Sequence, residues 1–249
     1  MSGYQALAAY YDRLTLNVDY NKRTGYIISL FERHYSGELE VLLDLACGTG
    51  SIAVELAARG FDVIGVDSSE EMLSLASQKA AEKGLPLMLL CQDMRSLDLY
   101  GTVDGAVCLL DSLNHLCSRV ELAEVFKRLF LFVKPGGLFI FDVNTKFKHH
   151  NILGDNCFVF EEDDFVCVWR NRLISRTSEV DILLDFFVKN GDNYIRLTDS
   201  LRERAYSLNT ISRLLHDAGF ETLAIYDDLT FDAARDDSER VYFVARRSM

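Results

Sequence analysis

Residues 41–71, VLLDLACGTGSIAVELAARGFDVIGVDSSEE, constrain the fold of this chain more than any other stretch. Residues 41–43 form a short apolar run, which is typical of a parallel strand covered on both faces. The turn that follows contains Gly48 and Gly50 and opens a run with apolar residues at helical spacing. Residues 61–66 predict the next strand, which ends at Asp67. Together these features predict a nucleoside site in a doubly wound α/β sheet.

Two kinds of ligand fit this half-site. The spacing of Gly48, Gly50 and Ala53, with Asp67 nineteen positions after Gly48, satisfies the loose fingerprint of dinucleotide-binding proteins. Asp44 argues for a different ligand, because its carboxylate would repel a pyrophosphate bound at the turn. It would attract a ligand that carries an ammonium and a sulfonium group. S-adenosylmethionine carries both, and Asp67 could bind its ribose hydroxyls.

Two motifs of the chain resemble one enzyme family. The segment Asp44-Leu45-Ala46-Cys47-Gly48-Thr49-Gly50 closely resembles the first motif of class I S-adenosylmethionine-dependent methyltransferases. The turn Lys134-Pro135-Gly136-Gly137, predicted to end a helix before a strand at residues 138–141, resembles the same family. The whole pattern is similar to that of bacterial small-molecule methyltransferases, including the sugar-amine N-methyltransferases. This resemblance implies a doubly wound, seven-stranded, mostly parallel Rossmann-like sheet, with S-adenosylmethionine as the cofactor.

The chain is predicted to divide into three parts. Residues 1–36 precede the first strand and are expected to form a helical lid over the cofactor. Residues 37–148 and 207–249 are expected to form the methyltransferase domain, which ends in a hairpin at the sheet edge. Between residues 157 and 206, strand-like segments alternate with turn residues, which predicts an antiparallel meander. We therefore expect residues 149–206 to be an inserted antiparallel β cap, which supplies substrate specificity or a homodimer surface.

The expected cofactor contacts come from the motif and from the ends of strands. Asp67 is expected to bind the ribose, and Asp93 and Met94 are expected to hold the adenine. A tyrosine hydroxyl of the lid would bond the methionine carboxylate while its ring excludes water. The predicted cofactor-binding residues are Tyr11, Tyr20, Asp44, Ala46, Cys47, Gly48, Gly50, Asp67, Ser68, Met72, Asp93, Met94 and Leu109.

The loop after the strand predicted at residues 104–109 is where the transferred methyl group should emerge. His115 is the residue of this loop with proton chemistry near neutral pH, and Asp111 could orient an amine or hydroxyl nucleophile. These two are the candidate catalytic residues. With only two prolines, the chain lacks the Asn/Asp-Pro-Pro-aromatic motif that base- and glutamine-modifying methyltransferases often carry.

The sequence thus predicts an enzyme that transfers a methyl group from S-adenosylmethionine to an amine or oxygen of a small-molecule acceptor. Two alternatives stay open at this point. One is an NAD(P)-dependent oxidoreductase, which the loose glycine fingerprint allows. The other is an S-adenosylmethionine-binding protein without transferase activity, because the glycine motif reports binding and not turnover.

The composition of the chain indicates which binding partners and which cellular compartment to expect. A formal net charge of −12 disfavours nucleic-acid and anionic-membrane partners, which would be approached against a repulsive field. No secretory signal is visible. The six cysteines include no Cys-x-x-Cys pair, so they predict reduced thiols in a cytoplasmic protein. His149 and His150 have no acidic or cysteine partner at a ligand spacing, so the sequence predicts no metal site.

Overall fold

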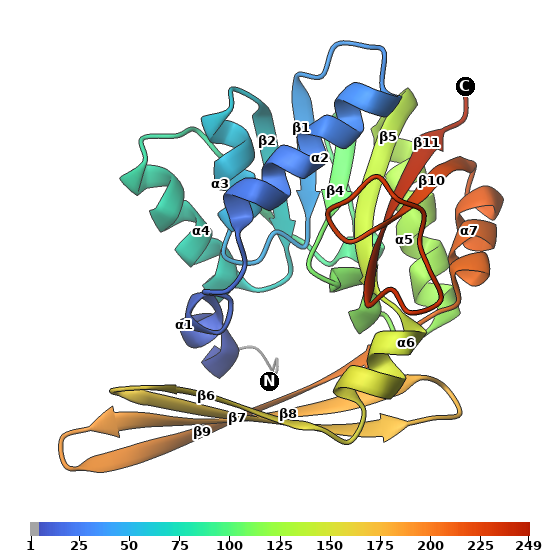
Figure 1. Cartoon of the computed structure of the whole chain (residues 1–249). Coiled ribbons are helices and arrows are strands. Elements are labelled where there is room, and N and C mark those ends of the chain that lie inside the picture. The colour runs from blue at the N-terminus through green and yellow to red at the C-terminus, as the bar shows by residue number, and fades with distance from the viewer. Residues whose placement is uncertain (1–4) are drawn as a thin grey trace.

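A mixed sheet of seven strands forms the centre of the molecule (Figure 1). The computed structural model describes residues 5–249, so the first four residues of the predicted lid lie outside the described part. From edge to edge the strand order is β10, β11, β5, β4, β1, β2 and β3. β11 runs antiparallel to β5 and β10, and the other neighbouring strands are parallel. The strands are β1 (Val41–Leu45), β2 (Asp62–Asp67), β3 (Met88–Cys91), β4 (Val103–Cys108), β5 (Val133–Asn144), β10 (Phe220–Asp227) and β11 (Arg240–Arg247).

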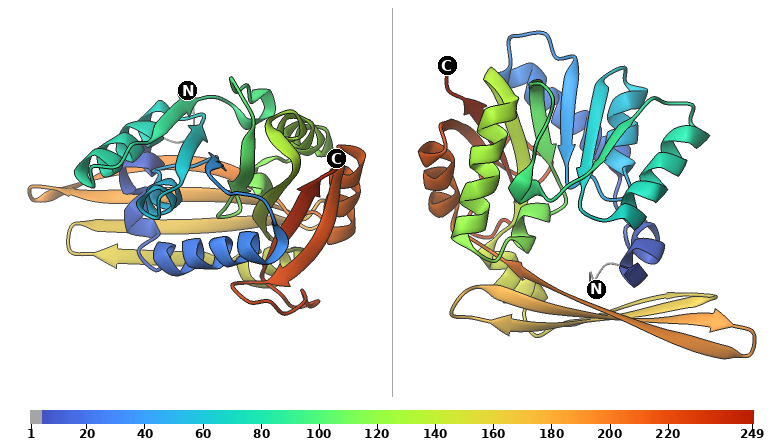
Figure 2. Two further views of the ribbon diagram at one scale, coloured as in Figure 1. Left: turned by 90° about the horizontal axis from the view of Figure 1, so that it is seen from above. Right: turned by 180° about the vertical axis from the view of Figure 1, so that it is seen from behind.

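Helices cover both faces of this sheet, as the apolar strands require. α2 (Tyr20–His34) and α3 (Ser51–Ala58) pack on the face that carries Leu42, whereas α5 (Arg119–Phe132) and α7 (Leu208–Asp217) pack on the face that carries Leu43. Figure 2 shows α2 and α5 on opposite sides of the sheet. α4 (Glu70–Glu82) packs beside α3 and against β2 and β3. Among residues 5–249, no helix is long and apolar enough to cross a membrane.

A second sheet forms a cap below the carboxyl ends of the parallel strands (Figure 1). It is an antiparallel meander of β6 (Cys157–Glu162), β7 (Phe165–Ile174), β8 (Glu179–Asn190) and β9 (Asn193–Arg204). α1 (Gln5–Leu14) lies between the cap and the main sheet, and its Tyr10 stacks on Phe165 and Phe186 of the cap. A short helix α6 (Lys146–Lys148) and a π-helix η3 (His149–Leu153) lead from β5 into the cap.

The predicted fold class, a seven-stranded sheet with an antiparallel cap, is confirmed. One predicted boundary was wrong. The Lys134-Pro135-Gly136-Gly137 turn was expected to separate the helix from the strand, but α5 ends at Phe132 and β5 already begins at Val133. Pairing with β4 is interrupted between Val133 and Leu138, so the turn forms an irregularity inside the strand. Gly136 takes a φ of +79° there, which explains the glycine.

A substitution at Gly105 in β4 would test how tightly α2 packs on the sheet. An added methyl group at Gly105 would overlap the ring of Phe31 and lie 3.1 Å from Leu42 Cδ2. We expect Gly105→Ala to lower the free energy of unfolding by about 1–3 kcal/mol, the usual cost of overpacking a core. Urea unfolding at equilibrium measures this change.

The matched control is Gly25→Ala in α2, because nothing lies within 4 Å of the methyl group that it adds. Alanine is favoured over glycine in a helix interior by about 0.5–1 kcal/mol, so this variant should be as stable as the parent chain or more stable. Equal destabilisation of the two variants would contradict the packing described for Gly105.

Candidate active site

Two adjoining cavities lie at the carboxyl ends of β1 and β4, where the strand order reverses. In doubly wound sheets ligands bind at this switch point. Ala46 lines both cavities, which makes them two parts of one cleft. The first, the Asp44 cavity, is lined by Tyr11, Tyr20, Asp44, Ala46, Cys47, Gly48, Thr49, Ser51, Ile52, Leu109, Leu110 and Ser112. The second, the Asp67 cavity, is lined by Ala46, Val66, Asp67, Ser68, Gln92, Asp93, Met94, Arg95, His115, Leu116 and Glu121.

Asp44 is the buried acid of the first cavity. Its side chain is buried, and its Oδ2 atom has no hydrogen-bond partner among the described residues. Burial, and to a lesser extent the charge of Asp67, raises the pKa of Asp44 to about 7. A buried carboxylate oxygen without a donor is costly, and a cation in the cavity would stabilise its charged form. The arrangement fits the ammonium and sulfonium groups of S-adenosylmethionine.

The glycine turn holds Asp67 against the start of α3. Asp67 Oδ2 accepts the Gly48 N–H at 2.9 Å, and Oδ1 accepts the Ser69 N–H at 2.9 Å. Gly50 caps α3 with a φ of +75°, and an added Cβ atom would lie 2.6 Å from the Cβ of Ala76 in α4. The carboxylate is therefore fixed beside the turn. Each of its oxygens keeps a lone pair that ribose hydroxyls could use.

Asp93 and Met94 line the far side of the Asp67 cavity, where the sequence places the adenine. The Arg95 guanidinium donates to both oxygens of Asp93, and its Nε lies 2.9 Å from Oδ1. This hydrogen bonding lowers the pKa of Asp93. An adenine amine would have to share the carboxylate with Arg95, so the role of Asp93 stays a prediction.

The lid is tied to the glycine turn by a lysine of α4. Asp12 Oδ1 accepts the hydroxyl of Thr49 at 2.7 Å and the ammonium of Lys79 at 2.8 Å. These bonds hold α1 over the Asp44 cavity, which Tyr11 and Tyr20 line. The Tyr20 hydroxyl bonds Thr15 at 2.9 Å, and burial raises the pKa of Tyr20. Both tyrosines thus remain protonated donors at neutral pH.

The two candidate catalytic residues differ in what they can do. Asp111 is ion-paired with Arg240, and the charges of Arg240 and Lys148 outweigh burial to hold its pKa at about 2. A carboxylate this acidic is too weak a base to take a proton at neutral pH, but it can orient a donor. His115 lines the Asp67 cavity, and donor atoms of Asp111, His115 and the cap residue Glu203 lie within 4.8 Å of one another.

Most of the predicted cofactor residues meet in the cleft, but two do not line it. Gly50 serves as the helix cap described above. Met72 is buried beside Leu7 and Ala8 of the lid, in the apolar cluster that joins α1 to the cap. Its position supports core packing rather than the predicted contact with adenine.

Sequence reasoning missed two residues that hold the loop after β4. Asp142, buried at the end of β5, accepts the backbone N–H groups of Leu110 and Asp111, and Arg240 of β11 donates to it at 2.6 Å. Asp142 follows an apolar strand just as Asp44 and Asp67 do, and that repeated pattern was the available signal. No sequence pattern indicated the role of Arg240, because its partners lie far away in the chain.

Comparisons with known proteins agree with this geometry. A family profile described as a methyltransferase domain matches residues 42–137. The putative methyltransferase YqeM of Bacillus subtilis is 35% identical over 98% of this chain and 97% of its own length. The glycine/sarcosine N-methyltransferase of Halorhodospira halochloris is 27% identical over 82% of this chain and 73% of its own length.

The fold comparison extends to the whole chain. The crystal structure of an S-adenosylmethionine-dependent methyltransferase from Clostridium acetobutylicum is 31% identical and superimposes with a TM-score of 0.89 over 100% of both chains. Relatives that align along the full length thus show that this chain belongs to the S-adenosylmethionine-dependent methyltransferases.

Proposed function

We propose that the enzyme transfers the methyl group of S-adenosylmethionine to an amine nitrogen or an oxygen of a small molecule. The observation that carries this proposal is His115, which lines the same cleft as Asp44 and Asp67 and lies beside Asp111. A relative named as a glycine/sarcosine N-methyltransferase supports the amine. Catalysis of this kind needs alignment, exclusion of water and at most one base.

Each residue of the cleft would have its own role in methyl transfer. S-adenosylmethionine supplies an electrophilic methyl group when it is bound. Asp67 would hold the ribose, Asp44 would face the positive charges, and α1 would exclude water from the Asp44 cavity. Asp111 would accept a hydrogen bond from the acceptor, and His115 would take the proton that the acceptor loses.

The proposal predicts transfer of label from radioactive S-adenosylmethionine to a low-mass component of fractionated cell extract. His115→Ala should slow this transfer about 10²- to 10⁴-fold, the usual contribution of a general base, while cofactor binding measured by calorimetry stays normal. His216→Ala is the matched control, because His216 is an exposed histidine of α7. Label in protein or nucleic acid would contradict the small-molecule acceptor. Binding without transfer in any fraction would support the non-catalytic alternative.

Asp44 predicts how cofactor affinity depends on pH. Because its pKa is raised to about 7, the side chain is largely neutral below that pH and charged above it. A cationic ligand favours the charged form, so affinity for S-adenosylmethionine should rise from pH 6 to pH 8. At pH 8, Asp44→Asn should weaken binding by about 1–3 kcal/mol, or roughly 5- to 150-fold.

Calorimetry at several pH values checks this expectation. The ammonium group of the ligand also titrates in this range, but it does so equally with both proteins. The difference between the parent chain and Asp44→Asn therefore isolates Asp44, and it should shrink towards pH 6. Parallel curves would show that Asp44 does not face the cation.

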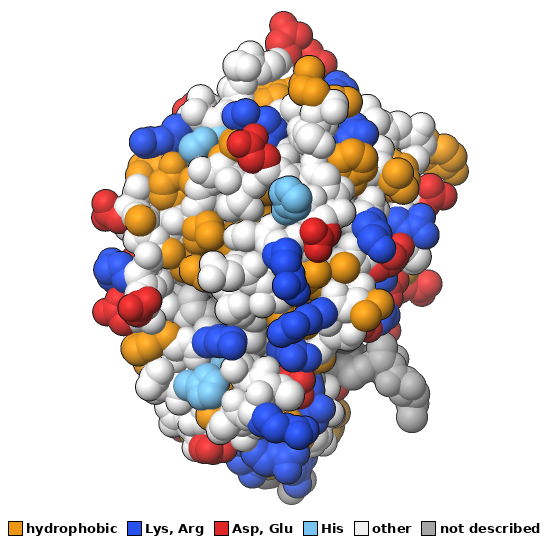
Figure 3. Space-filling view, turned by 90° about the vertical axis from the view of Figure 1, so that its right-hand side faces the viewer, with side chains coloured by type: hydrophobic (Ala, Val, Ile, Leu, Met, Phe, Trp, Pro, Cys, Tyr) orange, Lys and Arg blue, Asp and Glu red, His pale blue; other side chains and the backbone are white. Residues whose placement is uncertain are grey.

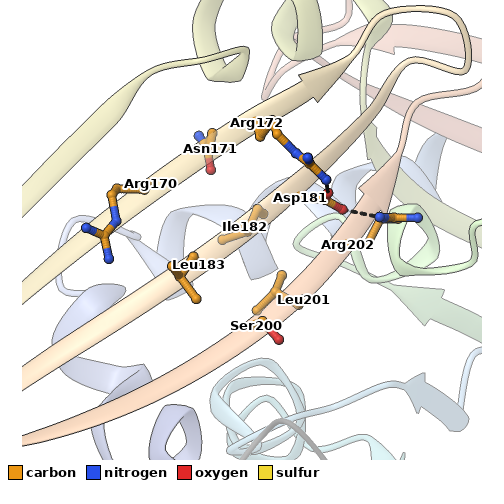
Figure 4. A pocket seen from close by; sticks show the side chains of 9 residues that line it. All are labelled: Arg170, Asn171, Arg172, Asp181, Ile182, Leu183, Ser200, Leu201 and Arg202. Carbon is orange, nitrogen blue, oxygen red and sulfur yellow. Dashed lines mark hydrogen bonds and ion pairs between the residues drawn. The ribbon is translucent and has the colours of Figure 1, made fainter.

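We further propose that the outer face of the cap, which points away from α1, joins two copies of the chain. A groove of about 670 Å³ crosses this region, and Figure 4 shows Asp181 of β8 between Arg172 and Arg202. Asp185 of the same strand pairs with Arg170 and Arg196. Figure 3 shows Lys and Arg side chains gathered towards the lower end of the molecule, where the cap lies.

Charge complementarity supports a second copy as the partner. The central strand β8 carries the acids of this face, and its neighbours β7 and β9 carry the arginines. Two copies related by a twofold axis present the same face to each other. A shift by one strand would set the arginines of each copy against the acids of the other.

The dimer is tested by light scattering coupled to size exclusion. We expect twice the chain mass for the parent protein, and the mass of one chain for Leu183→Glu, because a charge buried in an interface core costs more than about 2 kcal/mol. Leu131→Glu is the control, since Leu131 of α5 is exposed on another part of the surface. A parent protein that elutes as a monomer would refute the interface.

We also propose that the protein works in the cytoplasm. All six cysteines are free thiols in the structure, and Cys108 and Cys167 are buried. A reducing compartment keeps such thiols unpaired.

A further inference from the structure

The first observation is a group of carboxylate and imidazole side chains, the kinds that ligate metals, where the cap meets the main domain. Asp111 and His115 come from the loop after β4, and Glu203 comes from the end of β9. One donor atom of each lies within 4.8 Å of the other two. Ligands of one ion at bonds of about 2.1 Å lie about 3–3.5 Å apart, so a small contraction would close this group around an ion.

The second, independent observation is the ring of His149, which has no exposed surface. Its Nδ1 atom lies 2.9 Å from the carbonyl oxygen of Ser178, which can only accept, so Nδ1 carries the proton. Its Nε2 atom makes no hydrogen bond with any described residue and lies 3.4 Å from Glu203 Oε2. A ring nitrogen and a carboxylate oxygen therefore face each other in a buried place, and a metal ion beside them would bind to both.

The surroundings of these side chains match those of metal ligands. A ligating histidine usually donates its other ring N–H to a backbone carbonyl, as His149 does to Ser178. Glu203 is only 4% exposed, and Asn144 Nδ2 donates to it at 3.3 Å. The 3.4 Å between His149 Nε2 and Glu203 Oε2 equals the edge of a tetrahedral site with bonds of about 2.1 Å.

Positive side chains near the group limit how tightly an ion could bind. Arg240 is paired with Asp111, and Lys148 Nζ bonds Asn144 Oδ1 at 3.0 Å. Imidazole and carboxylate donors together suit Zn²⁺, Mn²⁺ and Co²⁺, whereas Mg²⁺ prefers oxygen alone.

We propose that His149, Glu203, His115 and Asp111 bind one divalent transition-metal ion. The ion would join the cap to the loop after β4. While it is bound, His115 would be a ligand and not the base proposed above, so metal binding would inhibit methyl transfer. The sequence predicted no metal at His149, because Glu203 lies 54 residues away and only the cap brings it close. This inference does not depend on the proposed function, since metal binding is measured without cofactor or acceptor.

The test uses the full chain after dialysis against a chelator. Titration with Co²⁺, followed by its visible absorption, and competition with Zn²⁺ should show one saturable site per chain, and Mg²⁺ should not compete. We expect Glu203→Gln and His149→Gln each to weaken Co²⁺ binding by more than about 100-fold. Loss of a direct ligand lowers metal affinity more than loss of a residue that only supports a ligand, which costs about 10- to 100-fold.

His150→Gln is the matched control. His150 is the adjacent histidine, and its Nε2 bonds Ser178 Oγ at 3.0 Å, so this variant should bind Co²⁺ as the parent chain does. If His149→Gln fails to fold, His115→Gln replaces it and should also weaken binding. Absence of saturable binding, or equal binding by the parent chain and Glu203→Gln, would overturn the proposal.

Discussion

Asp142 has no exposed surface, and the position of the loop after β4 depends on its carboxylate. Oδ2 accepts the N–H of Leu110 at 3.1 Å, and Oδ1 accepts the N–H of Asp111 at 2.7 Å. Both residues have a φ of +56°, a left-handed conformation that costs about 1–2 kcal/mol for a residue with a side chain. Hydrogen bonds to a charged group contribute about 1.5–3 kcal/mol each, which is enough to hold two such residues in place.

A buried carboxylate needs paired charge, and here the charge comes from distant parts of the chain. Arg240 of β11 lies 2.6 Å from Asp142, and Arg23 of α2 lies 3.6 Å from it. The lid region, the edge hairpin and the loop of the candidate site therefore meet at one acid. On the other side of the loop, the amide of Asn114 donates to the carbonyls of Asn144 and Arg204, which ties the loop to the cap. Site geometry and fold stability thus rest on the same contacts.

These contacts explain which features of the fold and the site could be predicted from the sequence and which could not. Asp44, Gly48 and Asp67 were predictable, because a strand, a glycine turn and the next strand are consecutive in the chain and form a local unit. The cap was predictable as a meander because its strands follow one another. The roles of Arg240 and Glu203 were not predictable, because their partners are brought close only by the final packing. The burial of Met72 was not predictable for the same reason: the lid covers it, and no local pattern reveals that cover.

The lid helix α1 has a consequence for turnover. Asp12 bonds Thr49 and Lys79 of the main domain, and the next residue, Arg13, pairs with Glu162 and Asp164 of the cap. The cavity beneath the helix measures only about 30 Å³. If the methionine end of the cofactor binds there, as we propose, it can exchange only when α1 moves. Each exchange must break both sets of charged contacts, and these contacts are partly exposed to solvent. Dissolved salt screens such pairs, so ionic strength acts directly on how fast the spent cofactor leaves and the next one enters.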